Sequence, residues 1–389
     1  MNGAPTAHPQ QHPHVLFAIL DWGMGHATRT WPLIATARRL GARVTVASRG
    51  TAGAWLDARM AEWDRRHDTE GLPPWTRVDK PGVTIVYARG LATLPRIALQ
   101  IPRFVRSIAR ERSWTTEFAR LHKVTHVFSD NCYGAWADVD GVRNVFMTHQ
   151  LHPPVPAPVK GWARSIVKRY AERFDAVWVP DTEDQALAGD LSKPISKATC
   201  FIGPLSRFQI GDNAAGDLGH ITKEEDRQPA LLGLVSGPEP QRSDMEAALR
   251  TCFLRDGRPA LILAGKPGGG EHQDANVLTV HDADDDRFRS AILNAETIVC
   301  RSGYSTLLDL VVLGRTAVLV PTVGQPEQEG LARDWHRKHG WTTVQAADLA
   351  TFAPINATGS PVRVDSAGPE STLRSWLNLE PEAPIGPAP

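Results

Sequence analysis

The chain has 389 residues, of which 42% are hydrophobic and 22% are charged, and 43 Lys and Arg residues balance 43 Asp and Glu residues. This composition excludes a disordered chain, and the even charge argues against a nucleic-acid-binding protein. No apolar run reaches the roughly 20 residues that a membrane-spanning helix needs. The four cysteines form no Cys-x-x-Cys pair, which disfavours a disulfide framework or a metal centre and favours a cytoplasmic protein.

The first half of the chain alternates short apolar runs with helical patterns, which indicates an α/β domain with a parallel sheet. Residues 1–13 are polar and rich in Pro and His, and we expect a disordered tail there. The expected strands are 14–20, 43–48, 83–88, 125–130, 143–148 and 176–180, and the expected helices include 31–40 and 97–121.

A second alternation follows the polar, turn-rich residues 209–229, which we interpret as a linker. Its expected strands are 230–237, 259–265, 276–280, 297–303 and 316–321, and its expected helices are 244–254, 287–295, 305–313 and 328–339. We therefore expect one domain over 14–208, a second over 230–376 and a loose tail over 377–389. Two doubly wound domains place a cleft between the carboxyl ends of their sheets.

The segment from Ala295 to Ala332, AETIVCRSGYSTLLDLVVLGRTAVLVPTVGQPEQEGLA, carries the strongest chemical signal. A strand runs into a Gly-containing turn and opens a helix, and such a helix N-terminus is a ready site for a diphosphate. The candidate residues are Ser302, Gly303, Tyr304, Ser305 and Thr306 at the turn, Asp309 for a ribose, and Gln325, Glu327 and Gln328 for a sugar. Taken singly, each feature is an ordinary cap, helical acid or surface loop, but their order favours a nucleotide-sugar site.

This arrangement resembles the donor domain of GT-B glycosyltransferases. It is similar both to the N-acetylglucosaminyltransferase of peptidoglycan synthesis and to the UDP-glucuronosyltransferase type. The segments RSGYST and GQPEQEGLA, together with DWGMGHATR and SGPEPQR, are similar to those of a bacterial subgroup. The resemblance covers roughly residues 14–345 and implies a GT-B fold, in which two Rossmann-like domains face each other across a cleft.

The resemblance implies donor-site roles at matching positions. Residues 302–306 would cradle the diphosphate, and Asp309 stands where the family usually has a Glu that holds the ribose. In VSGPEPQR, the first turn of the donor domain, Ser236 and Gly237 would approach the phosphates and Arg242 would neutralise them. The alternative for this segment is a Pro-rich turn with a solvated Arg.

We expect no metal and no cofactor beyond the nucleotide sugar, because fixed dipoles and an Arg can stabilise a leaving diphosphate. The run HDADDD, residues 281–286, contains an Asp-x-Asp pattern that metal-dependent glycosyltransferases of a different fold use. We interpret it as a solvated loop leading into a helix N-terminus, where acidic residues are favourable.

The stretch LDWGMGHATRT, residues 20–30, follows the first strand and would face the donor across the cleft. There His26 would take the proton of the acceptor hydroxyl, while Gly23 and Gly25 would let the backbone approach sugar or phosphate. Asp130 would orient His26, with Asp21 as a partner nearer in sequence, and His149 would line the cleft. The alternatives are a packing role for His26 and an Asx turn at Asp130.

Two basic, partly apolar segments at 94–112 and 159–174 permit two interpretations. They are either core-facing helices with a solvated side or interfacial helices that contact anionic lipid at the inner face of a membrane.

The sequence thus predicts a metal-independent, inverting glycosyltransferase that uses a UDP-linked sugar. Its acceptor would be a lipid, a lipid-linked sugar or a small natural product. The alternatives are a nucleotide-sugar epimerase or hydrolase of the same fold and a non-catalytic binding protein. A dinucleotide-dependent oxidoreductase is disfavoured, because no Gly-x-Gly-x-x-Gly follows a strand.

Overall fold

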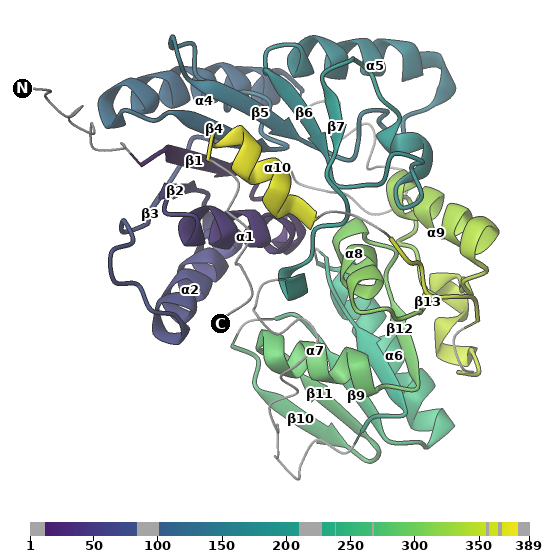
Figure 1. The fold of residues 1–389 in the computed structure, drawn as a ribbon. Helices are drawn as coiled ribbons and strands as arrows, with labels where there is room; N and C mark the ends of the chain where they lie inside the picture. Colours follow the sequence, from purple (N-terminus) through teal and green to yellow (C-terminus); the bar gives the residue numbers. More distant parts are fainter. Residues whose placement is uncertain are drawn as a thin grey trace, which may run out of the picture.

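The computed structural model describes residues 12–83, 101–209, 228–237, 239–266, 268–354, 358–364 and 368–379. They form two α/β domains that contact each other along one side (Figure 1). The expected tail over 1–13 lies almost wholly outside the described residues, as do residues 210–227 of the expected linker.

The N-terminal domain is built on a seven-stranded parallel sheet in the order β3-β2-β1-β4-β5-β6-β7. Its interior strand β1 is buried at every residue, as expected for a strand covered by helices on both faces. The strands are β1 (His14–Ile19), β2 (Arg43–Ala47), β3 (Thr76–Val78), β4 (His126–Asp130), β5 (Arg143–Met147), β6 (Ala176–Val179) and β7 (Thr199–Phe201). The helices are α1 (Met24–Arg39), α2 (Gly50–Arg66), α4 (Ile101–His122) and α5 (Ala157–Ala171).

The C-terminal domain holds a six-stranded sheet in the order β10-β11-β9-β8-β12-β13, parallel except for the edge strand β10. Its strands are β8 (Leu231–Leu234), β9 (Ala260–Leu263), β10 (Glu271–Asp274), β11 (Val277–Val280), β12 (Thr297–Cys300) and β13 (Val318–Leu319). Its helices are α6 (Gln241–Asp256), α7 (Asp285–Asn294), α8 (Tyr304–Val312) and α9 (Pro326–His339). The short 3-10 turns η2 (Gly189–Ser192) and η3 (Arg207–Gln209) close the N-terminal domain, and η4 (Ala346–Thr351) packs beside α6.

Most expected strands form within two residues of their expected bounds, whereas the edges of the sheets differ. The strands β3, β7 and β10 and the helix α2 were not expected. Most of the expected strand 83–88 and the start of the expected helix 97–121 lie outside the described residues.

The C-terminal segment differs from its expected assignment. Helix α10 (Gly368–Trp376) packs beside α1 of the first domain rather than on the second (Figure 1). Leu373 and Leu377 are buried in the N-terminal core, and the Trp376 ring lies against Phe128 and Trp178. Residue 377 therefore belongs to a packed core and not to a loose tail.

Candidate active site

The turn after β1 places three polar side chains on one face of α1. Gly23 precedes the helix with a φ of 128°, a conformation that side-chain-bearing residues rarely adopt. His26, Arg29 and Thr30 follow at spacings of three and four residues, so they share a helix face. Since β1 pairs with β4, Asp130 at the end of β4 lies beside Ile19 at the end of β1 and directly below this face.

Asp130 is the partner of His26 in this structure. The His26 Nδ1 atom lies 3.0 Å from Asp130 Oδ1, and the carboxylate is fully buried. Asp21, the alternative partner, pairs instead with Arg49 at 2.5 Å. Burial raises the pKa of Asp130, but the Arg29 guanidinium and His26 outweigh burial and hold that pKa below its ordinary value. Asp130 is therefore an ionised carboxylate at neutral pH.

Two further side chains complete the surroundings of Asp130, and sequence reasoning gave neither of them a role. Thr30 Oγ1 donates to Asp130 Oδ2 at 2.7 Å. Arg29 Nε donates to the same oxygen at 3.0 Å, and Arg29 Nη2 donates to Oδ1. The sequence did indicate their position, because residues three and four places after His26 in a helix lie on the same helix face as His26.

His149 of the first domain, which was expected to line the cleft, contacts two residues of the second domain. Its Nε2 lies 2.8 Å from Oε1 of Glu327 in the first turn of α9, and its ring stacks on Tyr304 at 4.0 Å between centroids. Gln150 donates to the other Glu327 oxygen at 2.6 Å. Burial raises the pKa of Glu327, but the His149 hydrogen bond and the nearby charges of His149, Arg29 and His26 together outweigh burial and hold that pKa below its ordinary value. Glu327, expected to grip a sugar, is bonded here to the N-terminal domain.

The hydroxyls of the expected diphosphate cradle are also bonded to protein groups. Ser305 donates to the Gly25 carbonyl at 3.0 Å, Tyr304 to the Pro180 carbonyl at 2.6 Å, and Ser302 to the Gln328 carbonyl at 2.8 Å. Helix α8 begins at Tyr304, and no side chain caps it at Gly303. The backbone N–H groups of its first turn are those that an anion would use.

Gly25 lies at the contact between the two domains. A Cβ atom on Gly25 would lie 2.5 Å from Ser305 Oγ, so this glycine permits close approach of the two domains.

We expect Gly25→Ala to destabilise the chain by about 1–3 kcal/mol, since the added methyl would force α1 and α8 apart. Ser305→Ala removes the clashing oxygen and leaves its Cβ 3.4 Å from the added atom. Urea unfolding of both single variants and the double variant tests this. A double variant no more stable than Gly25→Ala alone would contradict the contact.

Asp309 is buried at the connection between the domains. Ser206 Oγ donates to its Oδ1 at 2.6 Å, and Arg207 lies 3.5 Å from its Oδ2. Burial raises the pKa of Asp309 to about 6. Because both oxygens are engaged by the end of the first domain, the structure does not present this carboxylate for a ribose.

The raised pKa gives Asp309 a testable effect on stability. A carboxyl group whose folded pKa exceeds its unfolded pKa favours folding at low pH, and this contribution is lost as pH rises through the folded value. We therefore expect Asp309→Asn to stabilise the chain at pH 7.5 by about 2 kcal/mol, with the gain vanishing near pH 4. Urea unfolding at the two pH values measures this, and an equal effect at both would contradict it.

The turn at Ser236 and Gly237 leaves both residues exposed, and Gly237 has a φ of 101°. Arg242 is not available to neutralise a phosphate as expected. Its guanidinium bonds Glu239 at 2.7 Å, Glu246 at 3.0 Å and the Ala264 carbonyl at 3.0 Å.

Arg301, to which no role was assigned, lies next to this turn. A Cβ on Gly237 would be 3.5 Å from its Nη1. The guanidinium is buried and donates to Thr322 Oγ1 and the Gln241 carbonyl, and burial lowers its pKa. It lines a cavity of about 230 Å³ with Met245 and other residues of α6. Arg301 could have been found from the sequence, because it immediately precedes Ser302, the first residue of the expected diphosphate site.

The acidic run 281–286 forms ion pairs rather than a metal site. Asp284 caps α7, while Asp285 pairs with Arg59 and Arg207 at 3.1 Å each, and Asp286 pairs with Arg66 at 2.8 Å. Within the described ranges, no group of three or more His, Cys, Asp or Glu residues is arranged to hold a metal ion.

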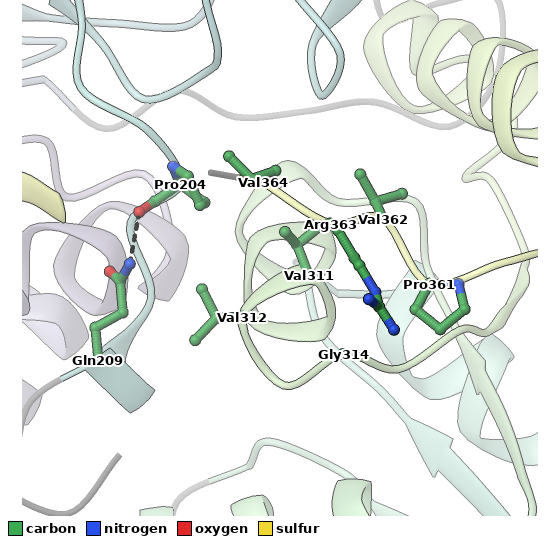
Figure 2. A pocket seen from close by; sticks show the side chains of 9 residues that line it. All are labelled: Pro204, Gln209, Val311, Val312, Gly314, Pro361, Val362, Arg363 and Val364. Carbon is green, nitrogen blue, oxygen red and sulfur yellow. Dashed lines mark hydrogen bonds between the residues drawn. The ribbon is translucent and has the colours of Figure 1, made fainter. Parts of the chain in front are cut away.

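A larger cavity of about 440 Å³ lies elsewhere, between the end of the first domain, the end of α8 and residues 361–364. Figure 2 shows Val311, Val312 and Val362 around it, with Gln209 bonded to the Pro204 carbonyl at 2.9 Å. Neither cavity is lined by His26, Asp130 or Glu327. His26 contacts Asp130, and Glu327 contacts His149 and Gln150.

Solved structures with the same two-domain arrangement define the fold. The glycosyltransferase SnogD from Streptomyces nogalater matches with a TM-score of 0.56 at 16% identity, over 95% of this chain and 99% of its own. Arabidopsis thaliana UGT89C1, complexed with UDP-L-rhamnose, matches with a TM-score of 0.57 at 13% identity, over 95% and 94%. The chain therefore has the GT-B fold, and the expected fold class is confirmed.

A curated protein from a Nocardioides species is similar in sequence, at 26% identity over 344 residues and 86% of each chain. It is named UDP-N-acetylglucosamine–N-acetylmuramyl-(pentapeptide) pyrophosphoryl-undecaprenol N-acetylglucosamine transferase. No protein-family model matches the chain.

Proposed function

We propose that this chain is a glycosyltransferase that moves a sugar from a UDP-linked donor to an acceptor hydroxyl, with inversion and without a metal ion. The observation that carries the proposal is the His26–Asp130 pair, which lies at the carboxyl end of one sheet opposite the α8 and α9 turns of the other. The likeness to a curated UDP-N-acetylglucosamine-dependent transferase and to a solved structure holding UDP-L-rhamnose supports the same donor class.

The geometry suits proton removal by His26. With its Nδ1 proton held by Asp130, His26 keeps a lone pair on Nε2, which takes the proton of the acceptor hydroxyl. The hydroxyl oxygen then bonds to the anomeric carbon while the bond from that carbon to the leaving diphosphate breaks. Attack from the face opposite the leaving group inverts the anomeric centre. Asp130 stabilises the imidazolium that results.

Charge on the leaving diphosphate would be met by protein groups of the second domain. The first-turn N–H groups of α8 carry partial positive charge, and the buried Arg301 guanidinium lies below the Gly237 turn. The glycine and serine of this turn would then approach the phosphates, as the resemblance implies.

An epimerase or hydrolase gains no support from the carboxylates present. Asp130 is fully buried and bonded to Arg29 and Thr30, and Glu327 is bonded to His149 and Gln150. Neither is a free acid beside His26.

The proposal extends to an acceptor at a membrane surface, one of the three acceptor classes named above. Among the described residues, no helix is long and apolar enough to cross a membrane. Val105 on α4 and Val159 and Trp162 on α5 are exposed apolar side chains among exposed Arg and Lys residues. Co-sedimentation with anionic vesicles tests this contact, and equal binding by Trp162→Glu would contradict it.

The function is tested by titration calorimetry with UDP, GDP and dTDP in the presence of EDTA, followed by UDP-release assays. The assays use a panel of UDP-sugars with lipid, lipid-linked and flavonoid acceptors. We expect binding of UDP in preference to the other nucleotides and acceptor-dependent release of UDP. Absence of binding by all three nucleotides would overturn the proposal.

A further inference from the structure

Arg29 is a buried cation that contacts Asp130, His26 and His149 of the first domain through a single guanidinium group. Its side chain is 2% exposed. Nε and Nη2 donate to the two oxygens of Asp130, and Nη1 lies 2.9 Å from His149 Nδ1. Nη2 and His26 Nδ1 lie 2.9 Å apart because both nitrogens donate to the same Asp130 oxygen, Oδ1. Burial lowers the pKa of Arg29, but the Asp130 carboxylate outweighs burial and raises it above its ordinary value.

These contacts fix the protonation of His149. A guanidinium can only donate hydrogen bonds, so the His149 Nδ1 atom facing Arg29 must carry a lone pair. The ring proton is then on Nε2, where it is donated to Glu327 Oε1 at 2.8 Å. Burial lowers the pKa of His149, which is consistent with this neutral form. Arg29 in the first domain thereby orients a carboxylate in the second.

The same guanidinium acts on His26 through Asp130. Two N–H groups of Arg29 and the Thr30 hydroxyl hold both carboxylate oxygens, so Oδ1 is fixed at 3.0 Å from His26 Nδ1. The Arg29 charge also offsets the negative charge of Asp130. His26 is thus held in one orientation by a carboxylate that is itself fixed.

We propose that Arg29 is a positioning residue that joins the His26–Asp130 pair to Glu327, setting the orientation of the base on one side and the tautomer of His149 on the other. This inference rests on the proposed function. It assigns Arg29 no contact with substrate.

The charged and titratable groups that face His26 set the expected pH dependence. They are Arg29 on the same helix, Asp130 at the end of β4, His149 after β5, and Tyr304 and Glu327 on α8 and α9. Burial raises the pKa of Tyr304 well above its ordinary value, so its hydroxyl is neutral. Of these groups, Arg29 is the permanent cation, and its removal leaves two carboxylates facing the two histidines.

The first test reads the tautomer of His149 by NMR of ¹⁵N-histidine-labelled full-length chain, with His149→Gln assigning the signal. In the native chain we expect an unprotonated Nδ1 across pH 6–8. In Arg29→Met we expect that signal to be lost or to titrate within this range. Arg29→Lys keeps the charge but lacks the planar fork, so it should also fail to fix the tautomer.

The second test compares pH profiles of kcat/KM for UDP-sugar turnover. We expect the acidic limb to move to higher pH by about one unit in Arg29→Met, and Arg29→Lys to restore its position because an opposite charge again faces Asp130. The matched control is Arg38→Met, which removes another buried Arg of α1 whose partners are Asp64, Trp63 and Trp75. Arg38→Met should change neither the pH of the acidic limb of the kcat/KM profile nor the NMR signal of His149.

The two readouts separate the possible failures. If the native chain turns over no UDP-sugar, the proposed function fails, while the NMR experiment still reports whether Arg29 sets His149. If the native chain is active but Arg29→Met leaves both the acidic limb and the His149 tautomer as in Arg38→Met, the Arg29 proposal alone is overturned. Thermal unfolding of each variant confirms that the comparison is made on folded protein.

Discussion

Replacing His26 with alanine is expected to lower kcat for sugar transfer by about 10²–10⁴-fold while leaving UDP affinity near its native value. The loss follows from removing the group that accepts the hydroxyl proton. The side chain is not part of a core, since it is 18% exposed and its recorded partners are Asp130 and Arg29. Stability should therefore change little, and activity should change greatly.

Steady-state kinetics and UDP calorimetry measure this result. His67→Ala is a suitable control, because His67 ends α2, stacks on Trp63 and lies outside the site. An activity of His26→Ala within threefold of the native value would remove His26 as the base and with it the mechanism proposed above.

Replacing Asp130 with alanine is expected to destabilise the chain by about 3–5 kcal/mol at pH 7, because the buried Arg29 charge would lose its carboxylate. Asp64→Ala serves as the control: it removes the partner of Arg38, an arginine that lies in the same helix as Arg29. The Asp64 side chain is 41% exposed, so its pair contributes about 1 kcal/mol or less. Urea unfolding of the two variants gives the comparison, and equal losses would contradict the buried pair.

The effect of Asp130 also depends on pH in a defined direction. Its folded pKa lies below its unfolded pKa, so its contribution is complete above the unfolded value of about 3.9 and is lost as pH falls below it. The stability difference between the native chain and Asp130→Asn should thus narrow below about pH 4. A difference that stays constant from pH 7 to pH 3 would show that charge is not its source.

The interior strands of both sheets were predictable because a buried parallel strand is a short apolar run bounded by turns. The edges were not, because β3, β7 and β10 are short and largely exposed and carry no such pattern. Helix α10 was not expected, and its residues were assigned to the second domain, because the pattern of one short helix does not show which domain it packs against.

The site shows the same division. The partner of His26 could be placed because β1 and β4 are adjacent parallel strands whose carboxyl ends meet at one edge. By contrast, the expected donor residues Asp309, Glu327, Ser305 and Arg242 are all bonded to protein groups. The contacts of Asp309, Glu327 and Ser305 depend on how two domains meet, and local patterns do not encode that geometry. The place of Arg29 on the helix face of His26 could be predicted from its spacing, but its contacts with Asp130 and His149 could not, because these residues follow two other strands.

Helix α10 has a consequence for how the molecule is made. The ribosome releases the first domain some 170 residues before it releases Leu373, Trp376 and Leu377, which fill that domain's core. Until then Phe128 and Trp178 lack the ring of Trp376, and His126 Nε2 lacks the Trp376 carbonyl that it contacts at 2.9 Å. The first domain is thus synthesised first, but its core is complete only after the second domain has been synthesised. In the nascent chain we expect the first domain to lack helix α10 while the second domain folds.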